Sequence, residues 1–231
     1  MMWSVACVVI VVLLVIHAWV RSGLAWMDFL ILRGAFVYCR FIHRWSANRR
    51  RPFPKKGPAI IVCNHTCSAD PAFLLAACDR PISVLVASEH FHIHPVAHAI
   101  LQHLGCVPVI RTGPDPIALR RAMARLARGD LLCLFPEGNL SGVALDRFRR
   151  PKPGVAFLAL ASRLPVYPVY IAGGPRTDQL LKSWVLPTRQ AVRVVFGNPV
   201  DLTPYYDRPR RRHLIEEVTR VLMQKVEELK K

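Results

Sequence analysis

One short segment carries a histidine and an aspartate at a spacing that suits acid–base chemistry. Asn64, His65 and Asp70 follow an apolar, β-branched run at 59–63, and Pro71 comes directly after the aspartate. Proline suits the first turn of a helix, so we expect Asp70 to be an N-cap and His65 to lie on the strand-to-helix turn. A carboxylate within hydrogen-bonding distance would hold the imidazole in one tautomer and make the other nitrogen a general base. A capping aspartate beside an unrelated loop histidine fits the same residues.

Three further segments place polar residues where strands are expected to end. Residues 105–111 (GCVPVIR) form a strand-like run that ends in Arg111, and an arginine at a strand end can bind a phosphate through two parallel hydrogen bonds. Residues 135–141 (FPEGNLS) run from a strand into a glycine turn with Glu137 at its tip. The last segment, 164–169 (LPVYPV), is preceded by Lys152, Pro153 and Gly154. No one segment identifies a function, but together they define an ordered pattern.

In this order the four segments resemble the motifs of the glycerolipid acyltransferase family, typified by 1-acylglycerol-3-phosphate acyltransferase. The family pattern is NHxxxxD, then a Gly-x-(Ile/Val)-x-x-x-Arg strand, then FPEGTRS, then a (Val/Ile)-Pro-(Val/Ile)-x-Pro-Val strand. The first block is complete here, and the later blocks match at Gly105, Val107 and Arg111, at Phe135, Pro136, Glu137, Gly138 and Ser141, and at Pro165, Pro168 and Val169. The resemblance covers about residues 55–200.

The resemblance implies direct acyl transfer. His65, oriented by Asp70, would take the proton from a hydroxyl of a glycerol-based acceptor, and that oxygen would attack the thioester of acyl-CoA or of an acyl-carrier protein. Such a mechanism forms no acyl-enzyme, so it needs no nucleophilic serine or cysteine, and it implies no metal and no cofactor beyond the acyl donor. The substrate-binding residues implied are Asn64, Gly105, Arg111, Glu137, Gly138, Ser141, Lys152 and Pro165, with Arg111 holding the phosphate of 1-acyl-sn-glycerol 3-phosphate.

Two positions depart from the family pattern and bear on the acceptor. Asn139 and Leu140 stand where the family usually has threonine and arginine, so a second phosphate-binding cation is missing. Arg147, Arg149 or Lys152 could replace it and restore a phosphomonoester site, which we favour because these basic residues follow so closely. The alternative is a pocket for another lysophospholipid or hydroxylated lipid.

The N-terminus predicts attachment to a membrane. The run from Trp3 to Val20 has no formal charge, and its length is about the minimum for crossing ~30 Å of hydrocarbon. A cleaved signal peptide is the competing interpretation, but no basic residue precedes the run and no small-x-small cleavage site follows it. Because arginines follow the run, the positive-inside rule places the remaining chain in the cytoplasm.

A second apolar segment, 24–45, carries Asp28 and three arginines, at 33, 40 and 44. The arginine spacing of seven and four places them on one face of a helix, which predicts a helix in the headgroup plane. A second membrane span and a core helix are the alternatives. We therefore divide the chain into N-terminal membrane-anchoring helices, 1–51, and an acyltransferase domain, 52–231.

The body of the chain alternates strand and helix patterns, which predicts an α/β fold: a mixed sheet flanked by helices, with N-terminal membrane helices. Strand-like runs lie at 59–63, 82–87, 106–110, 131–135, 166–171 and 192–197. Helical patterns lie at 71–78, 95–104, 116–128, 153–163 and 208–229, and Asp115 and Gly129 are the expected caps of the third helix.

Composition limits the remaining classes of protein. The chain is 52% apolar, which excludes disorder, and its net charge of +17 calls for an anionic partner. The basic runs lack the aromatic and helix-turn-helix patterns of nucleic-acid binding, so we expect an anionic phospholipid membrane and no nucleic acid. Seven scattered cysteines indicate a reducing compartment, and the segment 63–67 (CNHTC) lacks a second ligand pair for a metal. The segment 138–142 (GNLSG) differs from the G-x-S-x-G of lipid hydrolases.

Overall fold

A computed structural model describes residues 2–49, 53–138, 151–175, 177, 179–186, 188 and 190–230. The helices are α1 (Met2–Ser22), α2 (Trp26–Ile42), α3 (Asp70–Leu75), α4 (Ser88–Phe91), α5 (Pro95–His103), α6 (Pro116–Ala127), α7 (Gly154–Ser162), α8 (Leu180–Val185) and α9 (Arg212–Glu227), with 3-10 turns at Thr203–Tyr205 and Glu228–Lys230. The strands are β1 (Ser46–Ala47), β2 (Ala59–Cys63), β3 (Ile82–Ala87), β4 (Val107–Val109), β5 (Leu131–Leu134), β6 (Val166–Ala172) and β7 (Arg193–Phe196).

The strands form a mixed sheet in the order β1-β7-β6-β2-β5-β3-β4. From β6 to β4 neighbouring strands are parallel, whereas β7 runs antiparallel to β6 and β1 runs parallel to β7. The predicted mixed α/β sheet flanked by helices is therefore confirmed. Because five strands run the same way, the loops that leave β2, β3, β4 and β5 all emerge at one edge of the sheet, where α/β proteins place their ligands.

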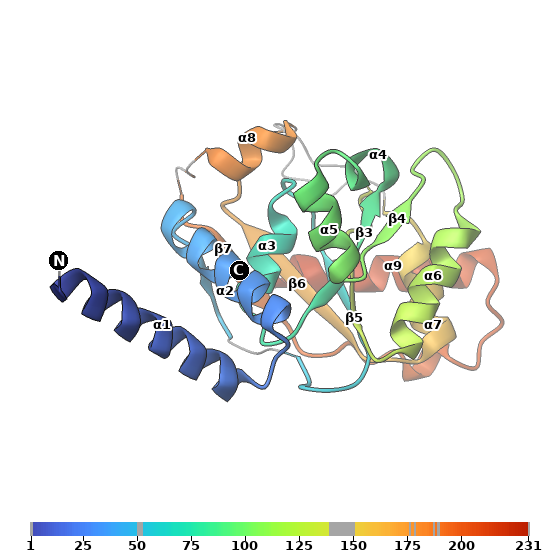
Figure 1. Cartoon of the computed structure of the whole chain (residues 1–231). Coiled ribbons are helices and arrows are strands. Elements are labelled where there is room, and N and C mark those ends of the chain that lie inside the picture. Colours follow the sequence, from blue (N-terminus) through green and yellow to red (C-terminus); the bar gives the residue numbers. More distant parts are fainter. Residues whose placement is uncertain are drawn as a thin grey trace.

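Helices cover both faces of the sheet (Figure 1). Ile61 and Cys63 of β2 pack in one cluster with side chains of α2 and α3, while Ile60 and Val62 pack in a second cluster with α6, α7 and α9. Every residue of β2 is fully buried. This burial on both faces explains why the strand reads as a continuous apolar run and does not alternate with polar residues.

Several predicted boundaries hold to within a few residues, and others need correction. Asp115 caps α6 as expected, since its carboxylate accepts a hydrogen bond from the Ala118 amide at 2.9 Å. The C-terminal helix begins at Arg212 and not at 208, and α4, α8 and β1 were not predicted. Arg44 lies beyond the end of α2 with φ at +50°, so it does not share a helix face with Arg33 and Arg40.

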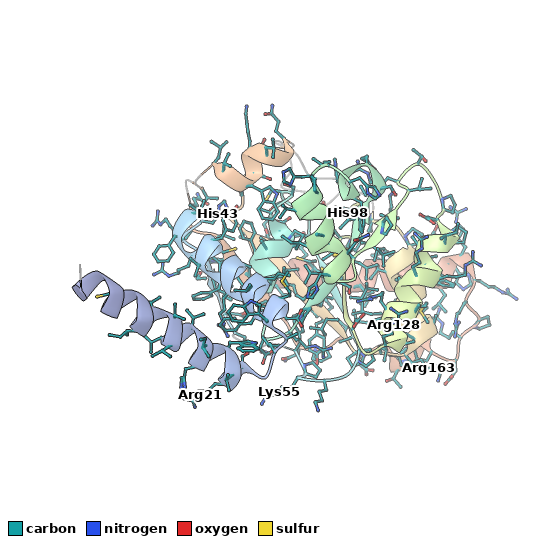
Figure 2. All side chains as sticks on the ribbon, in the orientation of Figure 1. Arg21, His43, Lys55, His98, Arg128 and Arg163 are labelled. Carbon is teal, nitrogen blue, oxygen red and sulfur yellow. The ribbon has the colours of Figure 1, made fainter. Side chains whose placement is uncertain are left out.

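The two N-terminal helices meet at a sharp bend. Among the described residues no single helix passes a test of length and hydropathy for a membrane span, but Ile10–Ser22 and Trp26–Ile42 pass it together as a pair bent by 110°. The apolar side chains of α1 are exposed from Ile10 onward, and no other described element surrounds the outer part of this helix (Figure 2). The span from Trp3 to Val20 stays a prediction.

Truncating a side chain between α9 and the sheet should destabilise the domain. Leu222 is fully buried in the cluster beneath α9, so Leu222→Ala is expected to lower the free energy of unfolding by about 2–5 kcal/mol. This corresponds to a decrease of roughly 4–20 °C in the melting temperature, measured by circular dichroism in detergent. Gln224→Ala, on the exposed side of the same helix, is the control, and equal melting temperatures for the two variants would contradict this packing.

Candidate active site

The loop that carries His65 leaves the carboxyl end of β2 and is held on one side by β6. The Asn64 side chain accepts a hydrogen bond from the Ile171 amide at 2.7 Å and donates one to the Ile171 carbonyl at 2.9 Å. The amide group is 4% exposed, so both of its polar atoms are used within the protein. Asn64, predicted to bind substrate, instead fixes the start of the loop to the neighbouring strand.

Asp70 organises the rest of the loop. Its fully buried carboxylate accepts hydrogen bonds from the Thr66 amide at 2.6 Å, the Thr66 hydroxyl at 2.8 Å, the Cys67 amide at 3.0 Å and the Cys67 thiol at 3.4 Å. The fifth contact joins its Oδ2 to Nδ1 of His65 at 2.9 Å. The prediction that Asp70 is the N-cap of the helix is wrong: Ala69 occupies that position, and the carboxylate turns back to bind the loop.

His65 is held between a carboxylate and an aromatic ring. With Nδ1 donating to Asp70, the basic lone pair lies on Nε2. The imidazole stacks on the ring of Phe135 with centroids 4.3 Å apart, and its side chain keeps 18% of its surface exposed. Phe135, at the end of β5, was not among the predicted site residues, although its place directly after a strand was a signal. The pair can therefore accept a proton from a group that reaches Nε2.

Glu137 and Gly138 shape the other side of the loop. Glu137 is 4% exposed, and its Oε1 accepts a hydrogen bond from the backbone amide of His65 at 2.9 Å. Gly138 has φ at +67°, and a Cβ there would lie 2.6 Å from Cε of Lys152, so the turn requires glycine. Both residues were predicted to bind substrate. Glu137 joins the loops after β2 and β5, and Gly138 lines the cavity described below.

Two cations, Arg111 and Lys152, line the same cavity as His65. Arg111 follows β4, and Nζ of Lys152 donates to its carbonyl oxygen at 3.0 Å. The Arg111 guanidinium forms an ion pair with Glu89 of α4. A hydrogen bond from its own backbone amide and the contact with Arg111 lower the pKa of the Glu89 carboxyl. Glu89 was not predicted; the signal for it was its place just after β3, the strand beside β4.

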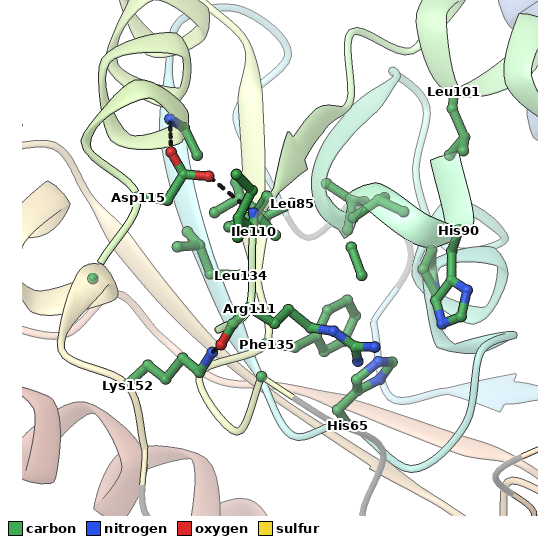
Figure 3. Close-up of a pocket in the computed structure, with 18 of the residues that line it drawn as sticks. His65, Leu85, His90, Leu101, Ile110, Arg111, Asp115, Leu134, Phe135 and Lys152 are labelled. Carbon is green, nitrogen blue, oxygen red and sulfur yellow. Dashed lines mark hydrogen bonds between the residues drawn. The ribbon is translucent and has the colours of Figure 1, made fainter. Parts of the chain in front are cut away.

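A cavity of about 1530 Å³ opens beside these residues (Figure 3). His65, Arg111 and Lys152 line it. Its walls are mainly apolar side chains of β3, β5, α5 and α8 and of the segment after β4, among them Leu85, Leu134, Leu101, Leu181, Trp184 and Ile110. Polar reactive groups at one part and apolar walls elsewhere suit a ligand with a polar head and a hydrocarbon chain.

Two predicted residues, Gly105 and Pro165, lie away from the cavity. Gly105 and Pro165 lie at the opposite edge of the sheet, where β4 and β6 begin. Gly105, with φ at +68°, makes the turn into β4, and Pro165 accepts a hydrogen bond from the Ile60 amide at 2.9 Å. Neither residue lines the cavity, and their part in substrate binding stays a prediction. Ser141 lies outside the described residues, as do Asn139, Leu140, Arg147 and Arg149.

The cysteines nearest the site are buried and poorly suited to act as nucleophiles, and the described residues form no cluster of metal ligands. No group of three or more potential ligands comes together among the described residues. Burial, together with the charge of Asp70, raises the pKa of the Cys67 thiol, and burial likewise raises the pKa of Cys63 and Cys133. A thiol with a raised pKa is a poor nucleophile at neutral pH.

The fold and the site define an α/β protein with a hydrogen-bonded histidine–aspartate pair beside a large, mainly apolar cavity. The chain belongs to the Acyltransferase family, whose family model matches residues 45–172. Its fold is similar to the crystal structure of the 1-acyl-sn-glycerophosphate acyltransferase PlsC from Thermotoga maritima, with a TM-score of 0.64 and 21% sequence identity over 93% of this chain and 87% of that one. No protein with a curated description matches the sequence.

Cys67→Ala should leave the enzyme active. The thiol makes the longest of the five contacts to Asp70, at 3.4 Å, and four other donors remain on that carboxylate. We expect kcat to stay within about threefold of the wild type, measured as acyl transfer from a radiolabelled acyl-CoA. A loss of activity of a hundredfold or more would instead indicate an acyl-cysteine intermediate.

Removing the charge of Glu89 should strengthen binding of an anionic acceptor. Glu89→Gln preserves size but leaves the whole charge of Arg111 for the ligand, so KM for an anionic lysolipid acceptor is expected to fall about two- to fivefold with kcat unchanged. Glu216→Gln, in the exposed pair with Arg212 on α9, is the matched control. An increase in KM would show that Glu89 holds Arg111 in its working position.

Proposed function

We propose that this acyltransferase moves an acyl chain from acyl-CoA or acyl-carrier protein to the free hydroxyl of a lysophospholipid. We name 1-acyl-sn-glycerol 3-phosphate as the acceptor, with phosphatidic acid as the product. The observation that carries the proposal is the contact between His65 and Asp70 beside a cavity that also presents Arg111 and Lys152. The name printed for the structural neighbour, a lysophosphatidic acid acyltransferase, supports the same acceptor.

The proposed chemistry needs one base and no covalent enzyme intermediate. Nε2 of His65 takes the proton of the acceptor hydroxyl while the oxygen attacks the thioester carbonyl. The C–O bond forms, the C–S bond breaks, and the imidazolium returns its proton to the departing thiolate. Asp70 stabilises the imidazolium through the 2.9 Å contact with Nδ1. The apolar walls of the cavity hold the acyl chain, and Arg111 and Lys152 face the phosphate.

A second acceptor class is favoured by one observation. The ion pair with Glu89 reduces the net charge that Arg111 offers to a dianionic phosphomonoester. The phosphate of another lysophospholipid carries a single negative charge, so its binding to Arg111 would be weakened less by this ion pair. The acceptor panel described below therefore includes lysophospholipids with larger head groups.

The proposal includes the location of the enzyme. We propose that residues 1–51 attach it to an anionic membrane and that the catalytic domain faces the cytoplasm. The exposed apolar side chains of α1 and α2 and the exposed Arg33 and Arg40 support this attachment.

The function is tested with one radiolabelled acyl-CoA and a panel of lysophosphatidic acid, lysophosphatidylglycerol and lysophosphatidylethanolamine. We expect labelled phosphatidic acid, and Asp70→Asn should reduce kcat by about 10²–10⁴-fold because the amide cannot orient and stabilise the protonated imidazole in the same way. Asp207→Asn, at a side chain that is 89% exposed, is the control. Release of free fatty acid without transfer to any acceptor would refute the proposal and indicate a hydrolase.

A further inference from the structure

Helix α6 presents a row of positive charges to solvent. The helix and the residue that follows it, 116–128, contain four arginines and neither an aspartate nor a glutamate. One of the four, Arg125, is paired with Asp130 at 2.6 Å. The other three are exposed: Arg120, Arg121 and Arg128. The positive charge of these three side chains therefore faces solvent.

These cations share a face of α6 with an apolar side chain. The residues at 117, 121, 124 and 128 follow the three- and four-residue spacing of one helix face, and each of them is exposed. Ile117, in the first turn, keeps 51% of its surface exposed. We call Ile117, Arg120, Arg121, Ala124 and Arg128 the α6 surface. At 1.5 Å per residue this surface is about 16 Å long, with cations over most of that length.

The beginning of α6 is also part of the cavity wall. Ala118 and Leu119, which follow the exposed Ile117, line the cavity that contains His65. Ile215, near the start of α9, lines the same cavity and packs in one cluster with Leu119. A molecule bound to the α6 surface therefore lies beside the cavity.

The α6 surface lies far from the N-terminal helices. In β2, Ile61 and Cys63 pack in one cluster with α2 and α3, while Ile60 and Val62 on the other face of the sheet pack with α6, α7 and α9. Figure 1 shows α1 and α2 at one end of the molecule and α6 at the other. Because residues 1–51 are the proposed membrane attachment, the partner that suits the α6 surface is an anion in solution and not the bilayer.

We propose that the α6 surface docks an acidic acyl-carrier protein that delivers the acyl donor. This inference rests on the proposed function, in which such a carrier is one of two donors. The carrier is a small acidic protein that holds the acyl chain as a thioester on a flexible phosphopantetheine arm. Cations spread along a helix, with an exposed apolar residue at one end, complement a partner whose carboxylates are spread over its own surface. The arm then passes Ala118 and Leu119 and brings the thioester carbonyl to His65.

Coenzyme A, the other donor, suits this surface less well. Its negative charge is confined to the phosphates of its nucleotide end, and such a charge is bound by a compact group of cations. Arg120 and Arg128 are eight residues apart in the sequence, about 12 Å along the helix axis. Arg210 and Arg211, exposed before α9, add to the positive potential that attracts an acidic protein. The carrier protein is therefore the partner that the experiments address.

Docking is measured as direct binding, which needs no acyl transfer. The full chain in detergent is titrated against a fluorescently labelled acyl-carrier protein that bears its phosphopantetheine arm, and fluorescence polarisation gives Kd. The double variant Arg120→Glu, Arg121→Glu is expected to raise Kd about tenfold, with an unchanged melting temperature because glutamate and arginine are similar helix formers. The matched control, Arg193→Glu with Arg220→Glu at two other exposed positions, should raise Kd less than about twofold. Equal weakening by both double variants, or no binding by the wild type at low salt, would overturn the proposal.

A kinetic measurement separates docking of the carrier from catalysis. With the acyl chain on the carrier protein, the double variant at 120 and 121 is expected to raise KM for the donor about tenfold with kcat unchanged. With acyl-CoA, both values should stay within about twofold of the wild type, because this donor does not use the α6 surface. An equal rise in KM for both donors would overturn the proposal and indicate that the surface binds the part that the two donors share. If the wild type transfers from neither donor, the proposed function fails, and the polarisation titration still decides docking.

Discussion

The site depends on one buried carboxylate. Asp70 is fully buried, and its hydration is replaced by five donors that come from three consecutive residues, His65, Thr66 and Cys67. Leaving a buried carboxylate without such donors would be strongly unfavourable, so the loop must curl around it. The same hydrogen bonds that stabilise the charge therefore fix the direction of the imidazole. Asn64 and Glu137 then attach this loop to the strands on either side.

An imidazole that accepts a proton is stabilised by a nearby carboxylate, whereas a site for an anionic group needs positive charge. The sheet places these two groups at the ends of different strands. His65 depends on the carboxylate behind it, at the end of β2, whereas Arg111 stands three strands further along, at the end of β4. Glu89 weakens the cation site, because it neutralises part of the charge of Arg111. Under the proposed function, the balance of charge among Arg111, Lys152 and Glu89 would distinguish one anionic acceptor from another.

Much of the fold was predictable because strands β2, β3, β5 and β6 are short apolar runs bounded by turn residues. The contact between His65 and Asp70 followed from their spacing after a strand. The positions of Gly105 and Pro165 relative to the cavity could not be predicted, because a sequence motif does not show which end of a parallel strand lies at the cavity. Helix α8 was missed because its six residues are too few to show a helical period. The contact of Glu89 with Arg111 depends on strand order, which the sequence does not state.

Replacement of His65 tests most directly whether this residue is the general base. Transfer of a radiolabelled acyl chain to lysophosphatidic acid is measured for His65→Ala and for His213→Ala, a change at an exposed histidine of α9. We predict that His65→Ala lowers kcat about 10²–10⁴-fold, while its melting temperature and its membrane attachment match those of the control. Turnover by His65→Ala within a few-fold of the wild type would contradict the assignment of His65 as the general base.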